Sequence, residues 1–232
     1  MKYLVLLFLI IAIISCEKSN DRATVNLTFQ ATAPSGTVLK SAQSEDFTFD
    51  SAYIVLEKIE IKKIETEEDE GESEDKGEYD FFGPYLIDLM SGVGDQLPLV
   101  EVEPGIYSKL DAEMAYFEEI GYSFYLHGSF NNGAGETQEV EFEYSYMQSE
   151  DFKAENPDGF EISANQINEV LALIDLESLL IGVDLNLAEV DQDGVIRLNK
   201  ESNNDLADII ESNLEAASEL GLDEDENGEI DD

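Results

Sequence analysis

The chain has 232 residues, and its 54 acidic side chains against 12 lysines and arginines give a formal net charge of -42. Such an acidic surface repels nucleic acid and anionic lipid headgroups, and neither is expected as a partner. Divalent cations, in contrast, are expected to bind. A hydrophobic fraction of 43% still predicts a folded, globular protein. One cysteine and one histidine exclude an intrachain disulfide and a zinc site built from several such residues.

The first segment of the chain is typical of a secretory signal. Lys2 is followed by an unbroken apolar run over residues 3–14, and a serine precedes Cys16. A transmembrane anchor is the alternative, but a spanning helix needs roughly 20 apolar residues, and this run is shorter.

Residues 13–16, I-I-S-C, resemble the lipobox of bacterial lipoproteins. In that family the cysteine receives a diacylglycerol, is further acylated with fatty acids such as palmitate, and becomes the new N-terminus. The resemblance implies a signal peptide over residues 1–15 and lipidation of Cys16. It also implies a lipid-anchored protein of the cell envelope, in the outer membrane, on its periplasmic or cell-surface face. The alternative is an ordinary cleaved signal followed by a chance cysteine.

After the signal, the composition divides the chain into three parts. Residues 16–22 are short and polar, which predicts a tether between the lipid and the fold. Residues 23–187 form the predicted β-sandwich domain, and residues 188–232 form an acidic loop–helix–loop segment.

The predicted domain is dominated by strand patterns. Apolar and polar side chains alternate over residues 24–29, which predicts a half-buried strand. Similar patterns predict strands over residues 47–64, 97–102, 106–116, 122–130, 139–146 and 169–176. The pair Gly83-Pro84, in an aromatic segment, predicts a bend or an edge strand. Residues 65–78 and 148–159 are expected to be polar loops, and residues 177–182 a helical turn.

The clearest alternation lies at residues 139–146. It predicts that one face of the strand packs on the core and the other faces water, as in an antiparallel sheet. The expected buried residues are Val140, Phe142, Tyr144 and Tyr146, and the expected exposed ones are Glu139, Glu141 and Glu143.

Many short strands with turns between them, and without crossover helices, predict a mainly β protein, an antiparallel β-sandwich. The exception is residues 203–220, where apolar residues at helical spacing predict one C-terminal amphipathic helix. Gly221 is the expected stop signal of this helix.

Three segments carry a further resemblance. They are FDSAYIVLEKIEI at residues 49–61, GPYLIDL at 83–89 and PGIYSKL at 104–110. Together they are similar to a domain of unknown function found in exported bacterial lipoproteins, over residues 23–130. The resemblance implies a transthyretin-like or immunoglobulin-like sandwich without an assigned activity. The acidic residues 67–76 have no counterpart in it.

Two acidic loops are candidate calcium sites. In the first, Asp191 and Asp193 alternate and a glycine follows, as an EF-hand-type loop requires, but Lys200 stands where a bidentate glutamate is needed. The second loop resembles the calcium repeats of thrombospondin type 3. Its candidate ligands are Asp223, Asp225, Asn227 and Asp231. The alternative is an Asp/Asn/Gly turn followed by a solvated acidic tail.

His127 is the only histidine and therefore the only possible base of a Ser-His-Asp triad. Its place in a strand, opposite the apolar face, instead predicts an ordinary exposed polar residue, and no catalytic residue is assigned. The sequence therefore predicts a lipid-anchored, non-enzymatic accessory or binding module, stabilised by Ca²⁺, with a protein or glycan partner. The alternatives are a carbohydrate-active enzyme using a carboxylate pair and a calcium-dependent adhesin or spacer.

Overall fold

The computed structural model describes residues 22–32, 38–40, 46–64, 78–91, 97–116, 118, 121–132, 135–145, 150–225 and 227–231. The predicted signal peptide, Cys16 and nearly all of the tether lie outside this part of the chain, as do residues 65–77 and Tyr146. Within the described ranges, no helix has the length and apolar character needed to cross a membrane.

The described part of the chain is mainly β, with one large mixed sheet and two α-helices. The first strands in chain order are β1 (Ala23–Ala31), β2 (Val38–Lys40), β3 (Asp46–Lys63), β4 (Glu78–Asp88), β5 (Val100–Val102), β6 (Gly105–Met114), β7 (Phe124–Asn131) and β8 (Thr137–Tyr144). The remaining elements are β9 (Glu150–Ile162), β10 (Ile167–Ile174), α1 (Leu176–Leu179), the 3-10 turn η1 (Leu185–Leu187), β11 (Val195–Leu198), α2 (Asn204–Asn213) and β12 (Ser218–Leu222).

The sheet has the strand order β11-β8-β7-β3-β6-β9-β12-β10-β1-β5, and β2 and β4 also pair with β3. Most neighbouring strands are antiparallel, as predicted. The pairs β1–β10, β8–β11 and β9–β12, however, are parallel, so the sheet is mixed. Two of these parallel pairs involve β11 and β12. Both strands lie in the C-terminal segment, which was expected to form only loops and a helix.

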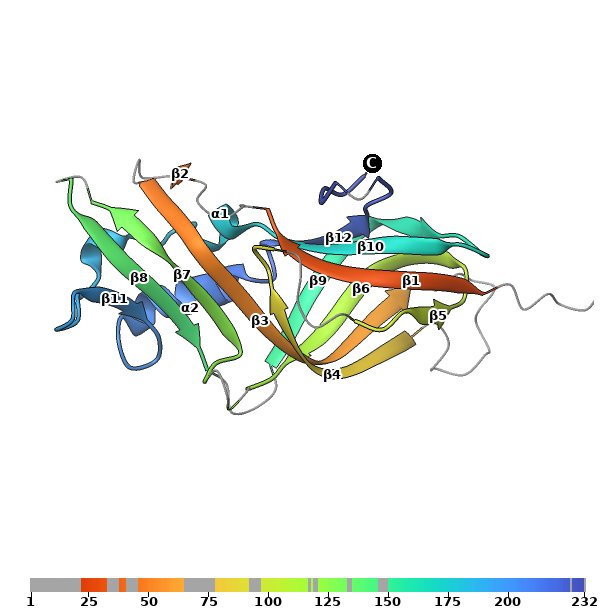
Figure 1. Ribbon diagram of the computed structural model, residues 1–232, viewed down its shortest axis with the longest axis horizontal. Helices are drawn as coiled ribbons and strands as arrows, with labels where there is room; N and C mark the ends of the chain where they lie inside the picture. Colours follow the sequence, from red (N-terminus) through yellow and green to blue (C-terminus); the bar gives the residue numbers. More distant parts are fainter. Residues whose placement is uncertain are drawn as a thin grey trace, which may run out of the picture.

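The long strand β3 joins the two halves of the molecule (Figure 1). Its first half pairs with β7, and its second half pairs with β4 and β6. The ladders shift register between Leu56 and Lys58, so the strand changes direction near its middle. Strands β7, β8 and β11 with α2 therefore lie at one end of the molecule, and β1, β5 and β10 lie toward the other.

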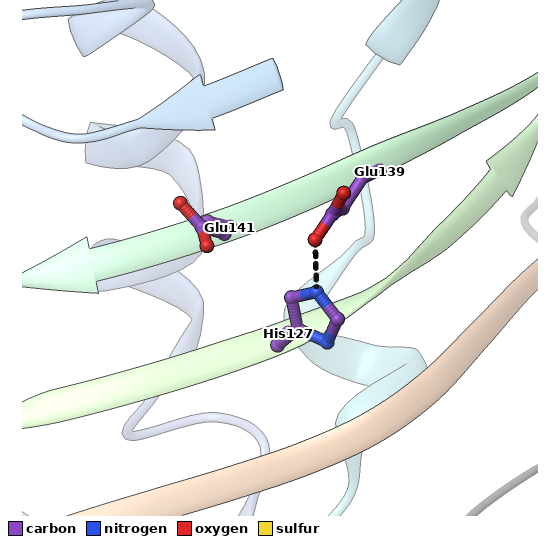
Figure 2. Close-up of side chains that lie close together, drawn as sticks. All are labelled: His127, Glu139 and Glu141. Carbon is purple, nitrogen blue, oxygen red and sulfur yellow. Dashed lines mark hydrogen bonds and ion pairs between the residues drawn. The ribbon is translucent and has the colours of Figure 1, made fainter. Parts of the chain in front are cut away.

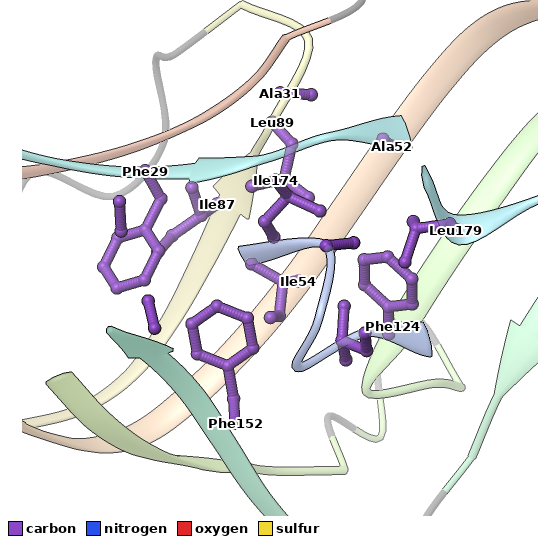
Figure 3. Packing of buried hydrophobic residues seen from close by; sticks show 14 of the residues in the cluster. Phe29, Ala31, Ala52, Ile54, Ile87, Leu89, Phe124, Phe152, Ile174 and Leu179 are labelled. Carbon is purple, nitrogen blue, oxygen red and sulfur yellow. The ribbon is translucent and has the colours of Figure 1, made fainter. Parts of the chain in front are cut away.

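A single apolar core connects these halves. In β1 the side chains alternate between buried and half-buried over all nine residues, as predicted, and the buried side includes Phe29. The ring of Phe29 lies 6.1 Å from that of Phe152 on β9, beside Ile54 and Ile87 (Figure 3). The N–H of Ala31 also donates to the carbonyl of Leu89 at 2.8 Å, so the end of β1 is attached to the chain just after β4.

The faces of β8 agree with the sequence pattern on the buried side. Val140, Phe142 and Tyr144 are no more than 5% exposed. On the other side Glu139 is exposed, as predicted, but Glu141 and Glu143 are half-buried. The cause is β11, which pairs with β8 and brings polar side chains over this face.

Three predicted elements are wrong in part. The helix begins close to the predicted position but ends at Asn213, and residues 218–222 form β12, because Leu220 is buried between neighbouring strands. Gly221 lies within that strand, and Ile230 packs against it. The polar loop predicted over residues 148–159 is largely β9. Its many outward charged residues make the sequence look polar, although Phe152 is buried.

Two smaller predictions hold. The turn expected after β10 is α1, and Asp175 caps it by accepting a hydrogen bond from the N–H of Glu177 at 3.0 Å. The Gly83-Pro84 pair lies in β4, which among the described strands pairs only with β3 and is therefore an edge strand.

Candidate functional site

The sheet formed by the first half of β3 with β7, β8 and β11 has two different faces. One face packs against α2 and belongs to the core. The other face carries aromatic and charged side chains from all four strands, and all of those named below except the exposed Glu139 are half-buried. We call this second surface the polar face, and it consists of Tyr53, Tyr122, Tyr125, His127, Glu139, Glu141, Glu143, Arg197 and Asn199.

Strand pairing places these side chains in rows across the polar face. His127 on β7 lies directly opposite Glu141 on β8, and Glu141 in turn lies opposite Arg197 on β11. In the next row Tyr53 lies opposite Tyr125. Because paired residues in adjacent strands have their side chains about 5 Å apart, each row brings its members into contact.

His127 has a carboxylate near each of its ring nitrogens, and Figure 2 shows it with Glu139 and Glu141. Its Nε2 lies 2.9 Å from Oε1 of Glu139, and its Nδ1 lies 3.6 Å from Oδ2 of Asp50. One ligand atom each of His127, Glu139 and Glu141 fall within 4.8 Å of one another. His127 lies opposite the apolar face, as expected, but its side chain is only 24% exposed and has specific neighbours.

Arg197 occupies the centre of the first predicted calcium loop. Its Nη1 donates to Oδ2 of Asp191 at 2.8 Å and to Oδ1 of Asp193 at 3.0 Å, and its Nη2 donates to Oδ2 of Asp193 at 2.9 Å. Its Nε lies 3.1 Å from Glu141. The hydrogen bonds to Asp193 and Asp191 raise the pKa of the guanidinium, and the same contact lowers the pKa of Asp193. The loop therefore brings the two predicted ligands together around a protein cation.

A group of stacked rings lies beside the histidine. Tyr122 and Tyr125 have ring centroids 4.5 Å apart at 15°, and Tyr53 stacks on the group 6.4 Å from Tyr125. The ring of Tyr125 is parallel to that of His127 within 5° at 6.5 Å. Burial, followed by the negative charge of Glu141, raises the pKa of Tyr125 to about 12, so its hydroxyl stays protonated at neutral pH.

The second predicted calcium loop follows β12. Both carboxylate oxygens of Asp223 accept backbone hydrogen bonds, from the N–H of Asn227 and the N–H of Gly228, each at 2.9 Å. Gly228 has a φ of +82°, which a glycine adopts without strain. Asp231 accepts from the N–H of Glu224 at 2.6 Å. The loop therefore closes on the side chains of its first and last predicted ligands.

Three of the four predicted ligands converge in this loop. One carboxylate oxygen each of Asp223, Asp225 and Asp231 lie within 4.8 Å of one another. The side-chain oxygen of Asn227 instead accepts from the N–H of Glu229 at 2.8 Å. No described lysine, arginine or histidine forms an ion pair with these carboxylates. Such a group of oxygen ligands around a short turn is the kind that Ca²⁺ prefers.

A small cavity of about 250 Å³ lies between α2 and the sheet. Its lining mixes apolar side chains, such as Phe124 and Phe142, with polar and charged ones. Glu211 borders it and lies 3.0 Å from the hydroxyl of Tyr144, and burial raises the pKa of this carboxyl group.

The chain matches no protein-family profile, no curated protein and no solved structure. The polar face is the site that the sequence did not predict. Its one recognisable signal was a histidine in a strand, followed by a hairpin partner with glutamate at every second position. The contribution of Arg197 was missed because β11 was not predicted.

Proposed function

We propose that this protein is an exported, lipid-anchored bacterial lipoprotein that acts as a non-enzymatic binding module in the cell envelope. The lipobox-like sequence before Cys16 supports the anchor and an outer-membrane location. The strands that pack around one core support a sandwich of the transthyretin-like or immunoglobulin-like kind. The oxygen-rich loop at residues 223–231 supports stabilisation by calcium, which exported proteins meet at millimolar concentrations.

The polar face is the observation that carries the proposed binding role. Two of its stacked tyrosines, Tyr53 and Tyr125, lie on the paired strands β3 and β7, and Tyr122 lies just before β7, so the rings keep their positions without a partner. Aromatic rings provide apolar contact area, and the neighbouring carboxylates accept hydrogen bonds from hydroxyl groups. A neutral glycan supplies both kinds of group, whereas an acidic glycan is repelled by the net charge of -42. We therefore propose a neutral glycan as the partner, with a neutral protein surface as the alternative outcome of the test.

The binding role is tested with purified protein lacking the lipid, titrated with neutral polysaccharides of the bacterial envelope. Tyr125→Ala removes the central ring of the stack, and we expect its affinity to fall at least about tenfold, since stacked rings often dominate such contacts. The matched control is Tyr116→Ala, which removes an exposed tyrosine outside the polar face. Equal affinities of the two variants would contradict the assignment of this face.

The anchor is tested by fractionating cells that express the Cys16→Ser variant. The serine cannot receive the diacylglycerol, so we expect the variant in the soluble envelope fraction, while the unsubstituted protein sediments with membranes. Ser15→Ala keeps the cysteine and a small residue before it and serves as the control. If the Cys16→Ser protein remains in membranes after a carbonate wash, it is not held by a lipid.

A further inference from the structure

We infer that His127, Glu139 and Glu141 form a binding site for a transition-metal ion of the zinc class. The inference goes beyond the proposed glycan-binding role and does not depend on it. It rests on the mixed nitrogen and oxygen ligands of this cluster, on the strands that position them, and on the groups that orient them from outside.

The backbone places the three side chains on one surface. β7 and β8 are antiparallel neighbours, His127 lies opposite Glu141, and Glu139 is two residues away on the same face of β8. Their ligand atoms lie within 4.8 Å of one another (Figure 2). Zn²⁺ binds nitrogen and oxygen ligands at roughly 2.0–2.2 Å, so its ligand atoms lie roughly 3–4 Å apart. Small side-chain rotations, without movement of the strands, bring these three groups onto one ion.

The groups around the cluster orient the ligands as in known metal sites. A histidine ligand usually directs its second ring nitrogen toward a carboxylate, and here Nδ1 of His127 lies 3.6 Å from Asp50 while Nε2 faces Glu139. The ring is also aligned with that of Tyr125. Glu141 also contacts Nε of Arg197 at 3.1 Å, which restrains its carboxylate before an ion arrives.

The ligand types select the ion. Ca²⁺ and Mg²⁺ prefer sites made entirely of oxygen, whereas an imidazole nitrogen favours Zn²⁺, Co²⁺, Ni²⁺ or Cu²⁺. Two carboxylates and a neutral imidazole carry a total charge of -2, which matches a divalent cation. Three protein ligands leave a fourth position open for water or for a donor atom of a partner.

The test uses the mature domain without its lipid, freed of metal with a chelator and kept in millimolar Ca²⁺ so that the acidic loops are already occupied. Zn²⁺ is added in a calorimetric titration, and Co²⁺ is added in parallel because its visible spectrum reports the ligands. We expect one equivalent of tightly bound ion, with a Co²⁺ spectrum indicating four or five ligands including nitrogen. His127→Gln and Glu139→Gln should each lower the affinity at least about tenfold.

Two controls separate this site from the general acidity of the chain. Glu113→Gln removes one outward carboxylate of β6, away from the polar face, and Asp225→Asn removes one from the C-terminal loop. Both should retain the one-equivalent binding. Because Glu139 is 54% exposed, its substitution should not disturb folding, which the melting curve verifies. An unchanged affinity in either His127→Gln or Glu139→Gln, or the absence of Zn²⁺ binding, overturns the inference.

Discussion

The two acidic loops have similar sequences but different surroundings. In residues 189–196 the carboxylates of Asp191 and Asp193 surround the guanidinium of Arg197. In residues 223–231 the carboxylates of Asp223, Asp225 and Asp231 converge, and no described basic side chain pairs with them. The first loop is thus partly neutralised by a cationic side chain of the protein itself. The second loop keeps a negative charge that an ion from solution can neutralise.

The difference arises from the strand next to each loop. Val195 begins β11, whose pairing with β8 turns Arg197 back over its own loop, where it also meets Glu141. The second loop instead follows β12, and its Ile230 packs against Gly221 of that strand. A pattern of alternating acids therefore predicts the shape of a turn better than it predicts the ion inside it.

The largest expected effect comes from weakening the strand under the first loop. Phe142 is 2% exposed on β8, and its ring lies 5.9 Å from that of Phe124. Phe142→Ala should lower the free energy of unfolding by about 3–5 kcal/mol, because it leaves a cavity in the core. Denaturant titration measures this loss.

The same variant tests whether the loops are independent. The C-terminal loop is attached to β12, which pairs with β10 and β9 and not with β8. Sites without shared contacts give additive effects, so Phe142→Ala should leave the stabilisation by calcium unchanged. A calcium effect that disappears together with the core contact would show that the two regions are coupled.

The sequence predicted those elements whose pattern alone determines them. β1 and β8 alternate clearly, because one face of each strand is buried, and Val140, Phe142 and Tyr144 of β8 are buried as predicted. β9 was missed because its outward residues are charged and its buried ones few. The sequence pattern predicts the end of a helix where β12 lies, because apolar residues such as Leu220 fit both the helical and the strand period, and only the pairing with β10 decides between them.

The candidate sites divide in the same way. The turn around Asp223 was predictable, since a glycine with positive φ and alternating acids are local features. The polar face was not, because its rows join β3, β7, β8 and β11, which are far apart in the sequence. The neighbours of His127 could not be predicted, because Glu139 comes from β8 and Asp50 comes from a register shift in β3, between Phe49 and Ser51.

The second prediction concerns the loop without a cation of its own. A ligand that binds only the folded state stabilises it by about 2.7 kcal/mol at a hundredfold excess over its dissociation constant. Calcium at that excess should therefore raise the melting temperature by roughly 5–10 °C relative to chelator, and Mg²⁺ should raise it less. Differential scanning calorimetry in the two buffers measures the shift.

Two substitutions within the same loop sharpen this prediction. Asp225→Asn removes one converging carboxylate and should abolish most of the calcium shift. Glu229→Gln removes the same charge from an exposed side chain outside the converging group and should retain it. If the two variants respond alike, or if Mg²⁺ reproduces the whole shift, calcium acts only by screening an acidic tail.

The substitution with the smallest expected effect tests the comparison of the two loops most directly, because it removes the arginine that partly neutralises the first loop. Arg197→Met keeps an unbranched side chain but removes the guanidinium, so Asp191, Asp193 and Glu141 lose their shared partner. Because these groups are partly exposed and water screens their charges, we expect only a small loss of stability, measured by denaturant titration in chelator. The variant should also gain a second calcium-dependent increase in stability, since its loop then resembles residues 223–231.

Arg197→Lys, which keeps the charge without the forked hydrogen bonds, should lose less stability and gain no such response. An Arg197→Met variant that calcium stabilises no more than the unsubstituted protein would show that the guanidinium is not what distinguishes the two loops.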